Sequence, residues 1–215
     1  MIMKNLSLGL LASILLCQTA FAAEQATSSM TEKPAKSAAQ FSTVNFNYPN
    51  ADKVEGFRFS TLHGKTANMK GLDLTLLGMS ETDNFSGVSF SLFAGINKVN
   101  KHFSGVSLSA ANWHLGQDEG LNIGLVNVTN SVKGVNFGIV NLSNTVAGAN
   151  IGFINYNKKF SLVDFGVMNI AKTAKFQFGI FNVAENLQGL QIGLLNYAEN
   201  GVVKILPLVN FRKTF

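Results

Sequence analysis

The chain has 215 residues, of which 47% are hydrophobic and 13% charged, and its formal net charge is +5. This composition excludes an intrinsically disordered chain, and its charge content lies well below the quarter that is usual in soluble domains. The length predicts one domain of ordinary size, and so small a net charge gives little reason to expect an anionic partner.

The first 22 residues predict a secretory signal peptide. Lys4 supplies a positive n-region, residues 6–16 (LSLGLLASILL) form an apolar h-region, and residues 20–22 (Ala-Phe-Ala) fit a cleavage site. We expect export to the periplasm, outer membrane or cell surface of a Gram-negative bacterium. Cys17, the only cysteine, would be removed, so we expect no disulfide or thiol chemistry. A lipid anchor at Cys17 is disfavoured because no small residue precedes it.

Residues 23–52 are predicted to form a flexible linker and an N-terminal cap. Residues 24–40 are small, polar and charged without an apolar period, which is typical of a linker. Between Phe41 and Tyr48 apolar and polar residues alternate, which indicates a strand, and a proline then marks a turn.

Residues 53–215 are predicted to form a tandem-repeat β domain. The pattern is most regular over residues 120–161, where three 14-residue blocks read GLNIGLVNVTNSVK, GVNFGIVNLSNTVA and GANIGFINYNKKFS. Such a repeat indicates a repeat architecture, and counting all its segments gives about eleven units. The final unit breaks the pattern, because Pro207 replaces glycine and cannot donate a ladder hydrogen bond. Residues 203–215 are therefore predicted to form a C-terminal cap.

The apolar residues of one unit alternate with smaller or polar ones, as in Val135, Phe137 and Ile139, which is the period of a β-strand. The alternation changes parity near an Asn in every unit, so we expect a bend there. The Asn side chains are predicted to stack as an amide ladder, the glycines to allow close approach, and the Val, Ile and Phe rows to fill a narrow core. The structural rows are Asn127, Asn141, Asn155, Asn169, Asn182, Asn196 and Asn210, with Gly124, Gly138, Gly152, Gly166, Gly179 and Gly193.

Two all-β architectures fit this pattern. The first is a parallel β-solenoid, or β-roll, of about eleven coils of ~14 residues. The alternative is a small outer-membrane antiparallel β-barrel, which the signal peptide and the C-terminal Phe215 favour. Membrane-spanning strands need about 9–11 residues and alternate short turns with long loops. An antiparallel order would not maintain a directional motif at fixed spacing, so the pattern favours the solenoid.

The units GLNIGLVN, GVNFGIVN, GANIGFIN and GLQIGLLN resemble the tandem repeats of a family of bacterial exported surface-repeat proteins. The ending GLQIGLLNYAENGVVKILPLVNF is similar to the C-terminal module of that family, and the resemblance covers residues 53–215. It implies export to the cell envelope, but no activity, substrate or catalytic residue. The period is also similar to that of trimeric autotransporter β-roll heads, from which the Phe-rich rows depart.

No catalytic, cofactor-binding or metal site is predicted, and we do not expect an enzyme. His63, His102 and His114 fall in different units, and the chain has no phosphate-binding or dinucleotide-binding motif. Nucleic acid is not an expected partner, because acidic residues share the band in which the lysines recur.

Three segments exceed the repeat length and are predicted to be inserted loops: residues 79–86, 97–104 and 112–119. Insertions in solenoids often form the binding face. The predicted function is a non-enzymatic cell-envelope or surface repeat protein, a structural or macromolecule-binding scaffold with an unknown partner; the alternative is the barrel, structural or a pore. The candidate binding loop contains Trp113, His114, Asp118 and Glu119, of which the last three come nearest to a metal site.

Overall fold

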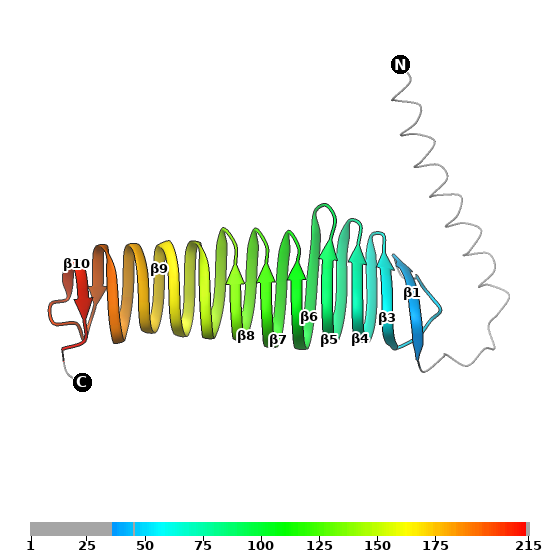
Figure 1. Ribbon diagram of the computed structural model, residues 1–215, viewed down its shortest axis with the longest axis horizontal. Coiled ribbons are helices and arrows are strands. Elements are labelled where there is room, and N and C mark those ends of the chain that lie inside the picture. Colours follow the sequence, from blue (N-terminus) through cyan, green and yellow to red (C-terminus); the bar gives the residue numbers. More distant parts are fainter. Residues whose placement is uncertain (1–35, 45, 214–215) are drawn as a thin grey trace, which may run out of the picture. The chain divides into compact units, whose positions relative to one another are not determined.

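The computed structural model describes residues 36–44 and 46–213, and these residues form a β-solenoid (Figure 1). The predicted signal peptide and Phe215 lie outside the described residues. One sheet contains all ten strands, in the order β10-β9-β8-β7-β6-β5-β4-β3-β1-β2. The strands are β1 (Ser37–Thr43), β2 (Phe46–Tyr48), β3 (Lys53–Ser60), β4 (His63–Thr75), β5 (Gly78–Ser91), β6 (Gly95–Leu108), β7 (Ala111–Ile123), β8 (Val126–Phe137), β9 (Val140–Ala198) and β10 (Ile205–Phe211).

Successive coils pair in parallel and in the register of the repeat. Gly56 pairs with Gly71, Gly71 with Gly87, and Gly87 with Gly105, so that equivalent residues stack on one another. β9 continues through several coils without a break, as the yellow and orange ribbon in Figure 1 shows. The parallel pairing confirms the predicted solenoid and contradicts the antiparallel alternative. Parallel pairing explains the fixed spacing of the repeat, because only in-register parallel stacking places equivalent residues of successive coils on one another.

Both ends of the sheet are antiparallel. β2 pairs with β1 in this sense, while β1 pairs in parallel with β3 and begins at Ser37, inside the segment predicted to be a linker. At the other end β10 reverses and pairs with β9, so the last of the eleven predicted units adds no parallel coil. Pro207 lies at the irregularity in this pairing, between Leu206 and Leu208, where a residue without an N–H is tolerated.

The three predicted inserted loops are wrong, because each lies within a strand. Residues 79–86 belong to β5, residues 97–104 to β6 and residues 112–119 to β7. Shifts of register absorb extra residues where β5 pairs with β6 and where β7 pairs with β8. A β-bulge accommodates an additional residue while the ladder continues on both sides of it.

The interior of the solenoid is largely polar, which reverses the predicted core. In the coil that begins at Asn136, the side chains of Asn136, Asn141 and Val146 are buried. Phe137 and Ile139 instead face outward, with 52% and 55% of their surface exposed. The alternation along the strand is the predicted one, but the opposite face points inward, because period 2 fixes which residues share a face and not which face is buried.

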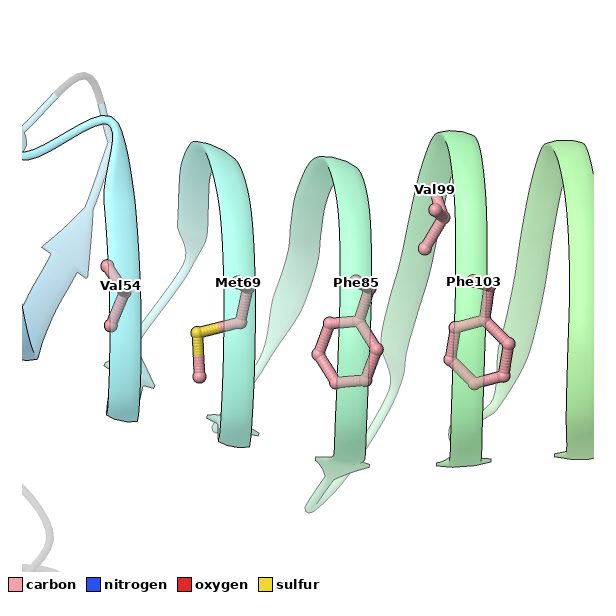
Figure 2. Close-up of a cluster of buried hydrophobic side chains, with 5 residues drawn as sticks. All are labelled: Val54, Met69, Phe85, Val99 and Phe103. Atoms are coloured by element: carbon pink, nitrogen blue, oxygen red, sulfur yellow. The ribbon is translucent and has the colours of Figure 1, made fainter. Parts of the chain in front are cut away.

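The buried apolar side chains include two clusters. Val54, Met69, Phe85 and Phe103 come from successive coils, and Val99 completes their cluster (Figure 2). The rings of Phe85 and Phe103 are stacked, with centroids 5.4 Å apart. Towards the C-terminal end a second cluster of smaller side chains contains Ala171, Ala174, Ala184, Leu187 and Ala198.

Candidate binding surface

The asparagine row forms a continuous ladder of buried amides. Nδ2 of Asn127 donates a 2.7 Å hydrogen bond to Oδ1 of Asn141, and a second, 3.1 Å bond to the backbone carbonyl of Phe137 in the next coil. Each asparagine therefore ties its coil both to the next amide and to the backbone across the bend. The same side-chain bond links Asn112 to Asn127, and then Asn141, Asn155, Asn169, Asn182 and Asn196 in turn.

The glycine row is required because it lies against this ladder. A Cβ on Gly138 would lie 2.5 Å from the carbonyl oxygen of Gly124 and 2.8 Å from Nδ2 of Asn127. Both distances are shorter than real Cβ contacts, so a side chain would push the ladder apart. Gly124, Gly152, Gly166, Gly179 and Gly193 meet the ladder amides in the same way.

Asn210, the last member of the predicted row, is buried but does not join the ladder. Its Nδ2 donates to the carbonyl of Val203, and its Oδ1 accepts from the backbone N–H of Phe211. Asn196 donates instead to the carbonyls of Gly193 and Leu206. The physical reason is the reversal of β10, which places Asn210 opposite Gln191.

A second polar row is fully buried along the length of the solenoid, although the alternation in the sequence favours an apolar interior. At its N-terminal end Nε and Nη2 of Arg58 donate to the two carboxylate oxygens of Asp73, over 2.8 and 2.6 Å. The pairing offsets two charges that could not be buried alone, while Nη1 of Arg58 has no hydrogen-bond partner among the described residues. The row continues with Ser89, Ser107, Asn122, Asn136, Asn150, Asp164, Gln177 and Gln191.

Asp164 is a buried carboxyl within this row. Burial raises the pKa of Asp164, and this effect exceeds the opposing effect of the hydrogen bonds that its carboxylate accepts. The donors include Ser161, Asn150 and Asn157, at 2.6, 2.9 and 3.0 Å from Oδ1. Because these groups are all occupied by one another, the interior offers no vacant polar site here.

The residues of the candidate binding loop do not come together as one site. All four lie on β7, where His114 and Asp118 point inward and Trp113 and Glu119 point outward. Nδ1 of His114 lies 2.8 Å from Oδ2 of Asp118, and the imidazole packs against Phe103 with ring centroids 4.6 Å apart. Among residues 36–44 and 46–213, no group of three or more His, Cys, Asp and Glu side chains is placed to hold a metal ion.

The outer surface carries the bulky apolar rows, which we call the apolar face. The residues two and four positions before a ladder asparagine are mostly exposed, and residues such as Leu125 and Phe153 have more than half of their surface in contact with solvent. Exposed apolar patches of this extent mark interaction surfaces. The apolar face comprises Leu125, Phe137, Ile139, Ile151, Phe153, Phe165, Ile180, Ile192 and Leu194.

A groove of about 620 Å³ follows part of the apolar face. Its floor contains Gly124, Gly138 and Gly152, and the side chains flanking each glycine form its two walls. The walls include the aromatic rings of Phe137 and Phe153. At these positions the missing Cβ would point inward at the ladder, so only backbone lies between the outward side chains, and the groove follows this backbone floor.

Charged side chains are segregated from the apolar face. Between residues 120 and 198, every exposed charged residue lies three to six positions after a ladder asparagine. The only other charged residue of this range is the buried Asp164. The charged side chains of these coils therefore share one position around the coil, which we call the charged corner. It comprises Lys133, Lys158, Lys159, Lys172, Lys175 and Glu185, and Glu199 extends it by one coil.

These features define the class of protein: a β-solenoid repeat protein with a hydrogen-bonded polar interior and an apolar outer face. Comparisons of the chain with protein-family models, with curated proteins and with solved structures found no match. Among the described residues there is no helix of the length and apolarity that crossing a membrane requires.

Proposed function

We propose that the protein is a non-enzymatic repeat scaffold of the cell envelope that binds its partner through the apolar face. The observation that carries this proposal is the direction of the side chains, with amide rows pointing inward and bulky apolar rows pointing outward. Soluble monomers rarely expose contiguous apolar surface on this scale. The predicted signal peptide and the resemblance of the repeats to exported surface-repeat proteins support the envelope as the location.

The geometry suits a scaffold because binding and folding use different side chains. The amide ladders, the Arg58–Asp73 pair and the Phe85–Phe103 stack hold the coils together from inside. The apolar face contributes little to that packing and is free to contact a partner. Covering a half-exposed Phe or Leu side chain contributes about 1 kcal/mol, so a partner that spans several coils gains several times that amount.

Fractionation of cells that produce matched variants tests the proposal. The double variant Phe153→Ser, Leu194→Ser removes two bulky side chains from the apolar face without touching the ladders. The control, Asn130→Ser with Asn144→Ser, changes an exposed amide pair beside the charged corner. We expect the unmodified protein and the control to remain with washed envelopes, and the double variant to appear in the soluble fraction.

Retention of the double variant in the envelope at the level of the unmodified protein would show that the apolar face is not the binding surface. Recovery of the unmodified protein in the soluble fraction would equally overturn the proposal. Circular dichroism of each purified variant verifies that its β structure is intact.

A further inference from the structure

We propose that the partner of the apolar face is the surface of an anionic lipid bilayer. The solenoid would lie along the bilayer with its apolar face in the acyl boundary and its lysines among the headgroups. This inference rests on the proposed function and names its partner. Three features support it: the placement of Trp and Tyr, the sign of the flanking charge, and the repetition of the apolar rows.

The first feature is that Trp and Tyr occupy the border between the apolar face and the charged corner. Of the one Trp and three Tyr in the chain, Trp113, Tyr156 and Tyr197 each directly follow an asparagine of the ladder. The phenylalanines of the apolar face, such as Phe137 and Phe153, lie on the rows before the asparagine instead. Side chains with an apolar body and a polar end are enriched at membrane–water interfaces.

Two of these border side chains contact charged neighbours. Nζ of Lys98 lies 5.2 Å from the ring centroid of Trp113, and the hydroxyl of Tyr197 donates a 2.9 Å hydrogen bond to Glu199. Trp113 has 41% of its surface exposed, so the indole can contact a lipid bilayer. Trp113 and Tyr197 thus combine an exposed aromatic ring with a charged neighbour, as side chains of an interfacial belt do.

The second feature is the charge beside that border. The charged corner, with Glu199, holds five lysines and two glutamates, and none of these side chains is on the apolar face. Lys133 is paired with Glu119, which leaves four lysines without a carboxylate partner among the described residues. An apolar face flanked by basic residues is the pattern of interfacial membrane binding, in which apolar burial and attraction to anionic lipids add. Lysine stems are long enough to keep the ammonium at the headgroups while the coil sinks further.

The third feature favours a bilayer over a second copy of the chain. The apolar rows repeat from coil to coil, and they contain no hydrogen-bonding group that could fix one register between two copies. Two copies placed face to face could slip by one coil without losing contact. A bilayer needs no register, and its anionic headgroups complement the lysines.

Fluorescence of Trp113, the only Trp, gives a direct test with the processed full chain purified from its host. The vesicles are phosphatidylcholine alone or phosphatidylcholine mixed with phosphatidylglycerol, with lipids brominated in the acyl chains as quenchers. We expect flotation with the mixed vesicles, a blue shift of Trp113 emission, quenching by bromine, and weaker binding at high salt. Absence of both flotation and the shift would overturn the lipid assignment.

Three variants with the same N-terminus as the unmodified protein separate the contributions. Phe153→Ser with Leu194→Ser is expected to weaken binding to mixed vesicles by about 25-fold, about fivefold for each side chain. Lys158→Gln with Lys172→Gln is expected to weaken it about fivefold per lysine on anionic vesicles only. The control Asn130→Ser, Asn144→Ser should bind as the unmodified protein does.

The outcomes distinguish this inference from the proposed function. If Phe153→Ser, Leu194→Ser leaves the envelope in cells but the unmodified protein ignores vesicles, the proposed function stands and the lipid assignment is wrong. If the unmodified protein sediments as a dimer that this variant dissociates, and does not bind vesicles, the apolar face joins two copies instead. Equal vesicle binding by the unmodified protein and Phe153→Ser, Leu194→Ser would also overturn the lipid assignment.

Discussion

Nδ2 of Asn150 donates a 2.9 Å hydrogen bond to Oδ1 of Asp164, and at this contact the direction of the buried amide row reverses. On the N-terminal side each amide donates towards the C-terminus, as Asn136 does to Asn150. On the C-terminal side Gln191 donates to Gln177, and Gln177 donates back to Oδ2 of Asp164 over 3.4 Å. An ionised carboxylate has only acceptors, so it can end two series of donors that run in opposite directions.

Asp164→Asn should remove a pH dependence of stability. Burial raises the pKa of Asp164 in the folded protein, so the folded state binds this proton more tightly than the unfolded state does. The contribution of the group is complete at pH values below the ordinary carboxyl range, and it is lost as the pH rises through the folded pKa. Relative to Asp164→Asn, the unmodified protein should therefore become more stable as the pH falls. Denaturant unfolding of both proteins between pH 4 and 8 measures this difference, and a constant difference would contradict the prediction.

Asn141→Ala should be much more damaging than Asn144→Ala. Asn141 accepts from Asn127 and donates to Asn155 and to a backbone carbonyl, whereas Asn144 makes an exposed bond to Asn130. Alanine at 141 leaves buried groups unsatisfied, and we expect a loss of about 2–4 kcal/mol in the free energy of unfolding. The loss for Asn144→Ala should stay below about 1 kcal/mol. Similar losses in the two variants would argue against the ladder as the main tie between coils.

Arg58→Ala tests the buried ion pair. The variant leaves Asp73 without its guanidinium in the interior, and we expect it to cost about 3–5 kcal/mol in the free energy of unfolding. Lys133→Ala breaks the exposed pair with Glu119, for which the loss should be at most about 0.5 kcal/mol. Thermal and denaturant unfolding of both variants provide the comparison. A small effect of Arg58→Ala would mean that Asp73 reaches water.

Phe103→Ala and Phe153→Ala test which face is buried. Phe103 is completely buried and stacked on Phe85, so its truncation should cost about 3–5 kcal/mol. Phe153 is 57% exposed on the apolar face, and its truncation should cost less than about 1 kcal/mol. The reverse order in a denaturant titration would show that the apolar rows, and not the amide rows, form the core.

The parallel solenoid could be predicted from the sequence because its cause is the period itself. A directional motif such as Gly138 followed by Asn141 recurs at nearly constant spacing only when equivalent residues stack. The bend near each asparagine and the stacked amides followed from the change of parity and from the chemistry of asparagine. The reversal at β10 had a local signal in Pro207, but the sequence does not say that β10 turns antiparallel.

Which face is buried could not be predicted from alternation alone. The rows of Phe137 and Asn136 occupy opposite faces in either assignment, and hydrophobicity favoured the wrong one. The decisive property is cooperative: a buried asparagine is stable only when the coils above and below supply its partners. The inserted segments were misjudged for a related reason. Excess length around His114 indicates an additional residue but does not distinguish a loop from a bulge within a strand.

The pairing of equivalent residues in successive coils also affects how such a protein can evolve. Each coil contacts mainly its two neighbours and presents the same Asn and Gly positions to both, as Asn141 does to Asn127 and Asn155. An in-frame duplication of one coil, such as that from Gly134 to Ala147, would therefore insert without disturbing either end. The protein would become longer by one layer while its cross-section stayed the same. Mutation can in this way adjust the reach of the molecule independently of its fold.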